Sequence, residues 1–302
     1  MNLTKGLMDE LMVHPGEPAQ LSKRSTKGTK VNWLHGIGGT EARDVAKRDL
    51  ADLRSELSKA QDLLYANASW SVLIVLQGLD AAGKDGTIKH VMAGANPQGS
   101  DVVSFKQPSD EELRHDYLWR TSKALPLRGR IGIFNRSHYE EVLICRVHPD
   151  LLAQEHLPSQ DYGQSFWEAR YEDINAFERH LVRNGTRILK FFLHISRDEQ
   201  RRRFLERLDD PRKQWKFSPA DIAERPFFEE YQRAYEAAIT ATSTSWAPWY
   251  IVPADHKYAL RALVGAFVVD AIDKLHLEYP KVSDEKRAEI EQAREQLLSE
   301  GA

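Results

Sequence analysis

Residues 71–95, S-V-L-I-V-L-Q-G-L-D-A-A-G-K-D-G-T-I-K-H-V-M-A-G-A, decide how this chain is expected to fold. The segment begins with a continuous apolar run at 72–76, which is typical of a parallel strand covered on both faces. Gly78 and Gly83 then stand five positions apart, and Lys84 follows, which is the frame of the phosphate-binding loop G-x-x-x-x-G-K-[ST]. The segment therefore predicts a strand, a glycine-rich turn that binds phosphate, and a helix whose dipole favours an anion.

The loop departs from that frame at two acidic residues. Asp85 stands where a Ser or Thr normally follows the lysine, the next hydroxyl is that of Thr87, and Asp80 lies inside the loop. Carboxylates repel phosphate unless a hard divalent cation such as Mg²⁺ lies between them. We therefore expect Mg²⁺ as cofactor, with Asp80 as its first candidate ligand and Lys84 at the terminal phosphates. The alternative, in which Asp85 caps its helix and Asp80 faces solvent, stays open.

The composition excludes several classes of protein. The chain has 302 residues, 41% hydrophobic and 29% charged, with a formal net charge of −3, which does not suit a basic nucleic-acid binder. The single cysteine, Cys145, excludes a disulfide framework and fits a reducing cytoplasm. No apolar run approaches the roughly 18 residues of a membrane span, and no signal-peptide core is found. We expect a cytoplasmic protein with neither nucleic acid nor membrane as partner.

Three segments are expected along the chain. Residues 1–39, rich in Pro, Gly and Lys, predict an extended N-terminal arm. Residues 40–280 predict the main domain, which begins with a long helix capped by Thr40 and contains a lid around 197–225. Residues 281–302 predict a charged C-terminal helix with few apolar positions.

Strands and helices alternate through the middle of the chain. Further strands are predicted at 101–106, 130–135, 188–195 and 249–252, and helices at 109–123, 162–184, 196–208, 218–242 and 255–275. Such alternation predicts an α/β fold in three layers, with a central parallel sheet between helices. Ligands of such sheets lie at the carboxyl ends of the strands, which here carry Gly78, Lys106, Arg136 and Arg197.

Positive charge is concentrated near this loop in the sequence. The stretch 120–136 holds five basic residues and no acid, and the stretch 197–216 holds eight basic residues and five acids. Some of the basic residues in the second stretch are explained simply as the solvent-exposed face of a helix. Lys213 and Lys216 lie between predicted helices, which indicates a basic lid that closes on phosphate. Asn135 replaces the acid that a typical P-loop kinase carries at this strand end, so Asp80, Glu140 or Glu141 is expected to compensate at the metal.

Three blocks of sequence resemble the family-2 polyphosphate kinases. These are G-L-D-A-A-G-K-D-G-T at 78–87, F-N-R-S-H-Y-E-E-V-L at 134–143 and A-P-W-Y-I-V-P-A-D at 247–255, and the resemblance extends over about 41–280. It implies a P-loop kinase fold similar to that of thymidylate kinase, with a helical lid. It also implies inorganic polyphosphate as phosphoryl donor, a nucleotide as acceptor, and Mg²⁺.

The resemblance implies roles for individual residues. Asp80 and Glu141 would bind the metal, Arg136 would hold the transferring phosphate, and Arg203 would act from the lid. Glu140 belongs to the N-R-S-H-Y-E block, which resembles the third class of the family, whose members phosphorylate both AMP and ADP. The residues expected to bind phosphate are Gly78, Ala81, Ala82, Gly83, Lys84, Asp85, Gly86, Thr87, Lys106, Arg120, Arg201 and Lys216.

Two other functions remain as alternatives. An ATP-dependent nucleoside monophosphate kinase would share the loop, but it does not need so many basic residues. A non-enzymatic P-loop binding module would not need Lys84, Asp80 and Arg136 together. Adenine nucleotides are the expected acceptors, with guanine nucleotides left open, and the direction of transfer is not fixed. The long helix and the resemblance both suggest a homodimer or homotetramer.

Overall fold

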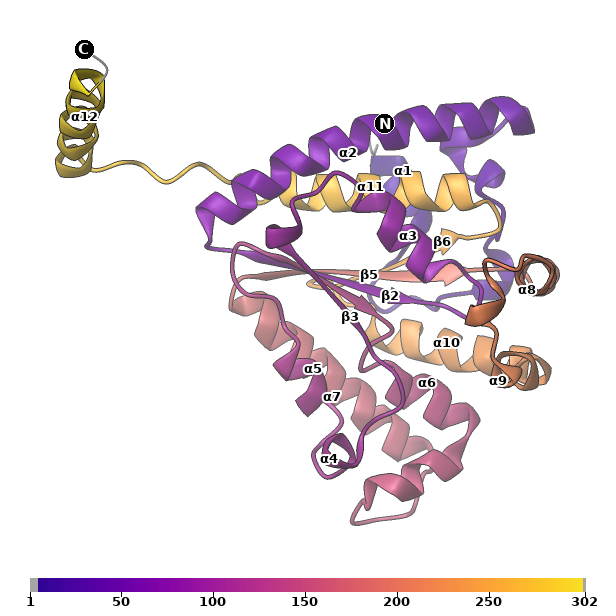
Figure 1. The fold of residues 1–302 in the computed structure, drawn as a ribbon. Helices are drawn as coiled ribbons and strands as arrows, with labels where there is room; N and C mark the ends of the chain where they lie inside the picture. The colour runs from indigo at the N-terminus through magenta and orange to yellow at the C-terminus, as the bar shows by residue number, and fades with distance from the viewer. Residues whose placement is uncertain (1–4, 301–302) are drawn as a thin grey trace.

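The computed structural model describes residues 5–300, which are built around a six-stranded sheet with the order β1-β6-β5-β2-β4-β3 (Figure 1). The strands are β1 (Met12–Val13), β2 (Ser71–Gln77), β3 (Ser100–Ser104), β4 (Ile131–Asn135), β5 (Thr186–His194) and β6 (Trp249–Pro253). Strands β2 to β6 pair in parallel, as predicted, whereas β1 runs antiparallel to β6 at the edge.

The central strand is β2, and it positions the glycine-rich loop. Every residue of β2 is buried, which explains its continuous apolar run. β2 pairs with β4 on one side and with β5 on the other. The chain first builds the β4–β3 half of the sheet and then crosses to β5 and β6, so the order reverses beside β2. Ligands of open α/β sheets bind at such a reversal, outside the carboxyl ends of the strands.

Helices cover both faces of the sheet and form the expected three layers (Figure 1). One face carries α2 (Gly39–Asn67), α3 (Lys84–Val91) and α11 (Lys257–Asp273), and α2 packs along α11. The other face carries α5 (Trp119–Lys123), α6 (Glu140–Val147), α7 (Gln164–Arg183) and α10 (Phe228–Thr242). The predicted fold class is confirmed.

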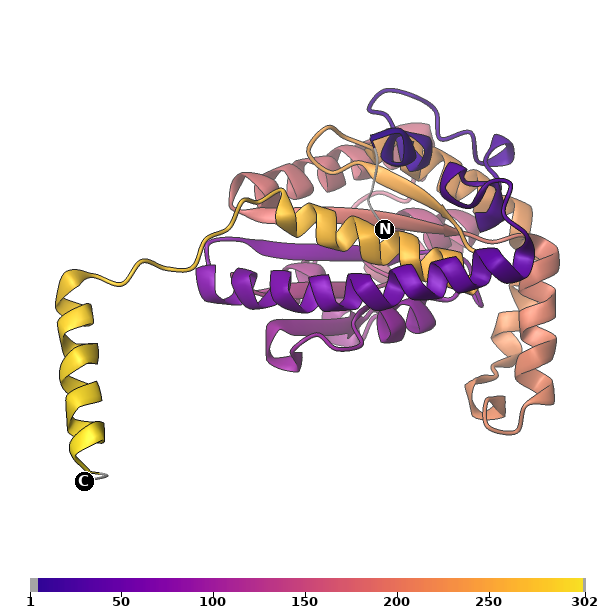
Figure 2. The ribbon, with the colours of Figure 1, turned by 90° about the horizontal axis from the view of Figure 1, so that it is seen from above.

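The segment expected to be a lid projects from the end of the sheet (Figure 2). It consists of α8 (Arg197–Asp209), α9 (Pro219–Ala223) and short 3₁₀ turns. The helix predicted over 218–242 is interrupted by the turn Arg225–Phe227, after which α10 begins. Pro226 accounts for the break, because its ring lacks an N–H and disfavours helix in the residue before it.

The N-terminal residues are not an extended arm. They form α1 (Lys5–Leu11), strand β1 and three 3₁₀ turns, and Leu7, Leu11 and Val13 are buried. The pairing of β1 with β6 joins residues far apart in the sequence, which no local pattern reveals. The long helix α2 begins with Gly38 as N-cap, so Thr40 does not cap it.

Two further differences concern helices away from the sheet's centre. The helix expected over 109–123 is divided into α4 (Asp110–Leu113) and α5, because the Asp116 carboxylate accepts the N–H of Leu118 in a local turn. The charged C-terminal helix α12 (Asp284–Ser299) buries none of its residues and stands apart from the body (Figure 1). None of the described helices is long and apolar enough to cross a membrane.

Candidate active site

The glycine-rich loop spans residues 78–83, between β2 and α3. Gly78 (φ 156°) has little room for a side chain, because an added Cβ would lie 3.0 Å from the carbonyl oxygen of Leu193. Gly83 (φ 112°) is the N-cap of α3, in a backbone conformation that favours glycine. The strand, turn and helix predicted from the sequence are confirmed.

Lys84 folds back over the loop. Its Nζ donates hydrogen bonds to the carbonyl oxygens of Gly78, at 2.6 Å, and Leu79, at 3.3 Å, and the residue is 9% exposed. Burial, followed by repulsion from Arg136, lowers the pKa of the Lys84 ammonium group. A buried cation held mainly by neutral carbonyls leaves positive charge for an anion to neutralise.

Arg136 joins two acids at the edge of the loop. Its Nη2 lies 2.6 Å from Asp80 Oδ1, and its Nη1 lies 3.4 Å from Glu140 Oε2. Attraction to Glu140 and then to Asp80 raises the pKa of Arg136, although burial opposes the shift. The backbone of Arg136 has φ 65°, a conformation that costs a non-glycine residue about 1–3 kcal/mol and that concentrates at functional sites. The structure therefore brings together three of the predicted residues, Asp80, Arg136 and Glu140.

A cavity of about 240 Å³ opens beside these three residues. Its other polar lining includes residues that the sequence did not single out, namely Gln200, Asp221, Glu224, Arg225, Tyr231 and Tyr235. Gln200 donates to the backbone carbonyl of Asp80 at 3.1 Å and accepts from Arg225 at 2.8 Å. These residues come from the lid and α10, and their only sequence signal is their position in or just after the basic stretch.

Arg203, expected to act from the lid, holds the backbone of the glycine-rich loop. Its Nη1 donates to the carbonyls of Ala81, at 2.9 Å, and Ala82, at 2.8 Å. Its Nη2 donates to the carbonyls of Ala254, at 2.5 Å, and Asp255, at 3.2 Å, and its Nε donates to Glu199 at 2.7 Å. An arginine has five N–H donors, so none remains for a phosphate. Arg203, which is 5% exposed, therefore holds the loop in this structure, and its expected role at the transferring phosphate stays a prediction.

Asp85 connects the loop to β4 and to the lid. Asn135 Nδ2 donates to its Oδ1 at 2.8 Å, and Lys216 Nζ lies 3.4 Å from its Oδ2. Burial would raise the pKa of Asp85, but the bonds from Asn135 and Lys216 outweigh it and lower the pKa. Because Gly83 is the N-cap of α3, Asp85 does not cap the helix. The ammonium group of Lys216, a lid residue predicted to bind phosphate, thus lies beside the first turn of α3.

A second cavity, of about 330 Å³, shares Arg136 and Glu140 with the first. Its apolar lining includes Phe105, Leu113, Ile144 and Leu151, and its charged lining includes Lys106, Arg120 and Glu141. Two adjoining cavities that meet at one arginine suit a reaction between two substrates.

Among the predicted phosphate ligands, Lys106 and Arg120 line this second cavity and Arg201 is exposed on α8. Arg120 is 8% exposed, and its Nη1 donates to the carbonyl of Lys106 at 2.8 Å. Thr87 is buried in α3, and its hydroxyl has no hydrogen-bond partner among the described residues.

Glu141 is not brought together with Asp80. Its Oε1 lies 3.1 Å from Arg120 Nη2, and its Oε2 lies 3.7 Å from Arg170 Nη1. Two arginines thus already neutralise Glu141, which is 6% exposed. The metal roles of Asp80 and Glu141 stay predictions, and Glu140 is the acid that shares Arg136 with Asp80.

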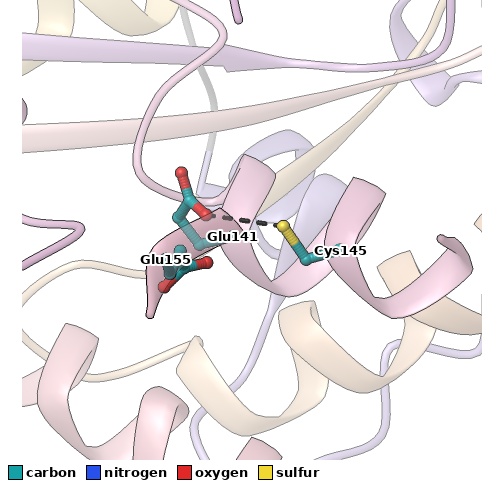
Figure 3. A group of neighbouring side chains, drawn as sticks. All are labelled: Glu141, Cys145 and Glu155. Carbon is teal, nitrogen blue, oxygen red and sulfur yellow. Dashed lines mark hydrogen bonds between the residues drawn. The ribbon is translucent and has the colours of Figure 1, made fainter. Parts of the chain in front are cut away.

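Glu141 instead lies in a group with Cys145, which is also buried, and Glu155, which is partly buried (Figure 3). The Cys145 thiol donates to Glu141 Oε2 at 3.5 Å. Burial, followed by repulsion from Glu141, raises the pKa of this thiol, so it stays protonated and does not offer a thiolate. Mg²⁺ prefers oxygen ligands in near-octahedral geometry, and this group does not fit it.

Comparison with known sequences identifies the same region. A sequence profile described as "Polyphosphate kinase 2 (PPK2)" matches residues 40–280. The chain is 54% identical to an ADP-polyphosphate phosphotransferase of Rhodopseudomonas palustris over 243 residues, which are 80% of this chain and 84% of that protein. It is 48% identical to an AMP/ADP-polyphosphate phosphotransferase of Meiothermus ruber over 244 residues, 81% of this chain and 86% of that protein.

Solved structures agree with this result. The fold resembles that of polyphosphate kinase 2 from Arthrobacter aurescens TC1 with a TM-score of 0.86 and 36% identity, covering 98% of this chain and 99% of that chain. A putative polyphosphate kinase 2 from Pseudomonas aeruginosa gives a TM-score of 0.70 at 29% identity, covering 82% of this chain and 50% of that chain.

Proposed function

The chain belongs to the polyphosphate kinase 2 family, and from this premise we propose that it transfers a phosphoryl group from inorganic polyphosphate to adenine nucleotides. It is a polyphosphate:nucleotide phosphotransferase. The observation that best supports this function is the contact of Arg136 with both Asp80 and Glu140 at the point where the two cavities meet. An ATP-dependent monophosphate kinase, the alternative, is disfavoured by the names of the relatives from Rhodopseudomonas palustris and Meiothermus ruber.

Phosphoryl transfer depends mainly on positioning and on charge stabilisation, with little covalent chemistry. Lys84 and the N-terminus of α3 would hold phosphate oxygens, and Lys84 offers a buried cation for this purpose. Arg136 would stabilise the negative charge that spreads over the transferring group. Its two acidic partners fix the guanidinium in one orientation, so little reorganisation is needed when the reaction occurs.

Asp80 and Glu140 fit a divalent cation. Asp80 has a side chain that is 29% exposed and lines the cavity beside the loop, and Glu140 lies across Arg136 from it. Carboxylates next to phosphate are the ligands that Mg²⁺ prefers. We propose that these two residues hold Mg²⁺, directly or through its water, and that the ion supplies neutralising charge to the phosphate oxygens.

The cavity lined by Phe105, Leu113 and Ile144 is the proposed site of the acceptor nucleotide. Its apolar walls suit a flat base, and its charged end at Arg120 and Arg136 suits the phosphates. We propose that both AMP and ADP are accepted, in line with the AMP/ADP activity that the Meiothermus ruber relative carries in its name. We also propose that the enzyme is a homodimer or homotetramer, to be tested by light scattering.

The test is ATP formation from polyphosphate and Mg²⁺ with either ADP or AMP, measured by luminescence. ATP from both acceptors is the expected result, and ATP from ADP alone would retain the donor but restrict the acceptor. Transfer from ATP to AMP without any use of polyphosphate would overturn the proposal in favour of a conventional monophosphate kinase.

A further inference from the structure

A glutamine ends the buried strand that leads into the glycine-rich loop. Gln77 is the last residue of β2, directly before Gly78, and its side chain is fully buried. The five residues before it are apolar and buried as well. A buried amide group costs free energy unless its donor and its acceptor are both hydrogen-bonded. The partners of this amide therefore decide what the residue does.

The Gln77 amide joins two segments that surround the site. Its Nε2 donates to the hydroxyl oxygen of Ser137 at 3.1 Å, and its Oε1 accepts a longer bond, of 3.5 Å, from the hydroxyl of Tyr235. Ser137 follows β4, next to Arg136, and Tyr235 lies on α10. Both bonds are buried, which strengthens them relative to bonds in water. One side chain thus links the end of β2 to the turn after β4 and to α10.

The backbone of Arg136 is held by β2 from two sides. Its N–H donates to the carbonyl of Leu76 at 3.1 Å. The hydroxyl of the next residue, Ser137, accepts the bond from Gln77. Arg136 has φ 65°, a conformation that a non-glycine residue keeps only where its surroundings impose it. The two contacts from β2 help to impose this conformation, and Gln77 supplies the one that comes from a side chain.

The residue that Gln77 contacts also places the start of α6. Ser137 Oγ accepts the backbone N–H of Tyr139 at 3.2 Å, and the Ser137 carbonyl accepts that of Glu140 at 3.0 Å. Glu140 is the first residue of α6, and its carboxylate lies 3.4 Å from the Arg136 guanidinium. A shift of Ser137 would therefore move both Arg136 and an acid that orients it.

The second partner of Gln77 fixes the direction of the amide. Tyr235 lines the cavity of about 240 Å³ together with Asp80 and Arg136. Burial, followed by repulsion from Glu140, raises the pKa of the Tyr235 hydroxyl, so this group stays protonated. A protonated hydroxyl donates to the amide oxygen of Gln77, which leaves the amide nitrogen to face Ser137.

We propose that Gln77 is a positioning residue for phosphoryl transfer, which acts through Ser137 to hold Arg136 in the orientation that the transferring phosphate requires. This inference rests on the proposed function, because it takes Arg136 as the group that stabilises the transferring charge. Gln77 itself is fully buried and lines neither of the two cavities that meet at Arg136. A displaced arginine stabilises the transition state less while the substrates still bind, so kcat should respond more than KM.

The test is a double-mutant cycle of Q77L, S137A and Q77L/S137A, assayed as ATP formation from ADP and polyphosphate. We expect Q77L to lower kcat about 10- to 100-fold, the effect of misplacing a group by about 1 Å, and to change the KM of either substrate less than about threefold. S137A, the smaller change, should lower kcat about tenfold for the same reason. Because both residues act through one bond, the double variant should be no slower than the slower single variant.

The matched control is Q61L. Gln61, on α2, is also a buried glutamine with two hydrogen bonds, to the carbonyl and the N–H of Asn96 at 2.9 Å and 2.7 Å, and it lines neither cavity. Q61L should lose stability in denaturant unfolding and keep the kcat of the wild type.

Four results would overturn the positioning role of Gln77. These are wild-type kcat in folded Q77L, a rise in KM alone, single effects that multiply in the double variant, and an equal loss of kcat in Q61L. If the wild type transferred phosphate from ATP to AMP without using polyphosphate, the proposed function would fall alone, because the same cycle on that activity would test the contact of Gln77 with Ser137. A wild-type protein with neither activity would overturn both.

Discussion

The Arg136 guanidinium lies 2.6 Å from the Asp80 carboxylate, although the two residues are 56 positions apart in the sequence. Asp80 lies within the glycine-rich loop after β2, and Arg136 follows the neighbouring strand β4. The parallel pairing of β2 with β4 brings the two strand ends together and so creates this contact. The same geometry adds Glu140 to the pair through Arg136.

Removing the charge of Asp80 should weaken the response of the enzyme to Mg²⁺. In D80N we expect the Mg²⁺ concentration for half-maximal activity to rise about 10- to 100-fold, the usual effect of losing a group that holds or orients a metal. The measurement is a Mg²⁺ titration of ATP formation. D62N, at an exposed position of α2, is the control and should behave as wild type. An unchanged titration in D80N would remove this residue from the metal site.

Replacing Arg203 should lower the stability of the fold even when the positive charge is kept. R203K keeps the charge but cannot satisfy the four carbonyls and Glu199 together, so we expect a loss of about 2–4 kcal/mol in the free energy of unfolding. Denaturant unfolding measures the loss, and the exposed neighbour variant R202K should show almost none. If R203K retained full stability yet lost turnover, Arg203 would be a phosphate ligand after all.

Lys190 and Glu178 form an ion pair in the core, below the site. Lys190 Nζ lies 2.6 Å from Glu178 Oε2 and 2.7 Å from the carbonyl of Thr242, and both charged residues are almost fully buried. K190M should cost about 3–5 kcal/mol of stability, because it leaves a buried carboxylate without its partner. K190M/E178Q should recover part of the loss. The partly exposed pair of Lys274 and Asp270 is the control, and K274M should cost less than about 1 kcal/mol. Wild-type stability of K190M would contradict this account.

The low pKa of Lys84 should set the alkaline limit of activity. The charged form binds phosphate, and burial lowers the pKa of this ammonium group below the ordinary 10.5. The value of kcat/KM, which reports groups of the free enzyme, should therefore fall with rising pH before an ordinary lysine would titrate. K84R, whose guanidinium stays charged, should not show this fall of kcat/KM at high pH in whatever activity remains. If kcat/KM of K84R fell over the same pH range as that of the wild type, the titration would belong to another group.

The sequence could predict the features that depend on local pattern. The buried run of β2, the glycine spacing and Lys84 identify the phosphate loop, and the alternation of strands and helices identifies the parallel sheet. The basic stretch identifies the lid but not the task of each arginine. Arg201 and Arg203 are two positions apart in one run, yet one is exposed and the other is buried against the loop.

The features that the sequence could not predict depend on contacts between distant parts of the chain. Gln200 reaches the loop, and Arg225 reaches Gln200, only because α8 and the turn before α10 fold over the loop. Glu140 and Glu141 are adjacent in the sequence but face different partners, since successive helical residues point in different directions. β1 owes its place to its pairing with β6, which begins more than two hundred residues later.

The most direct test of the central claim is ³¹P nuclear magnetic resonance of ADP, Mg²⁺ and polyphosphate incubated with wild-type protein or with K84M. The account predicts that the wild type converts ADP to ATP while the polyphosphate signal declines by the same number of phosphates. Folded K84M should be at least about a hundredfold slower, because a P-loop lysine stabilises the transferring charge. Equal rates in the two proteins, or ATP formed without loss of polyphosphate, would contradict the account.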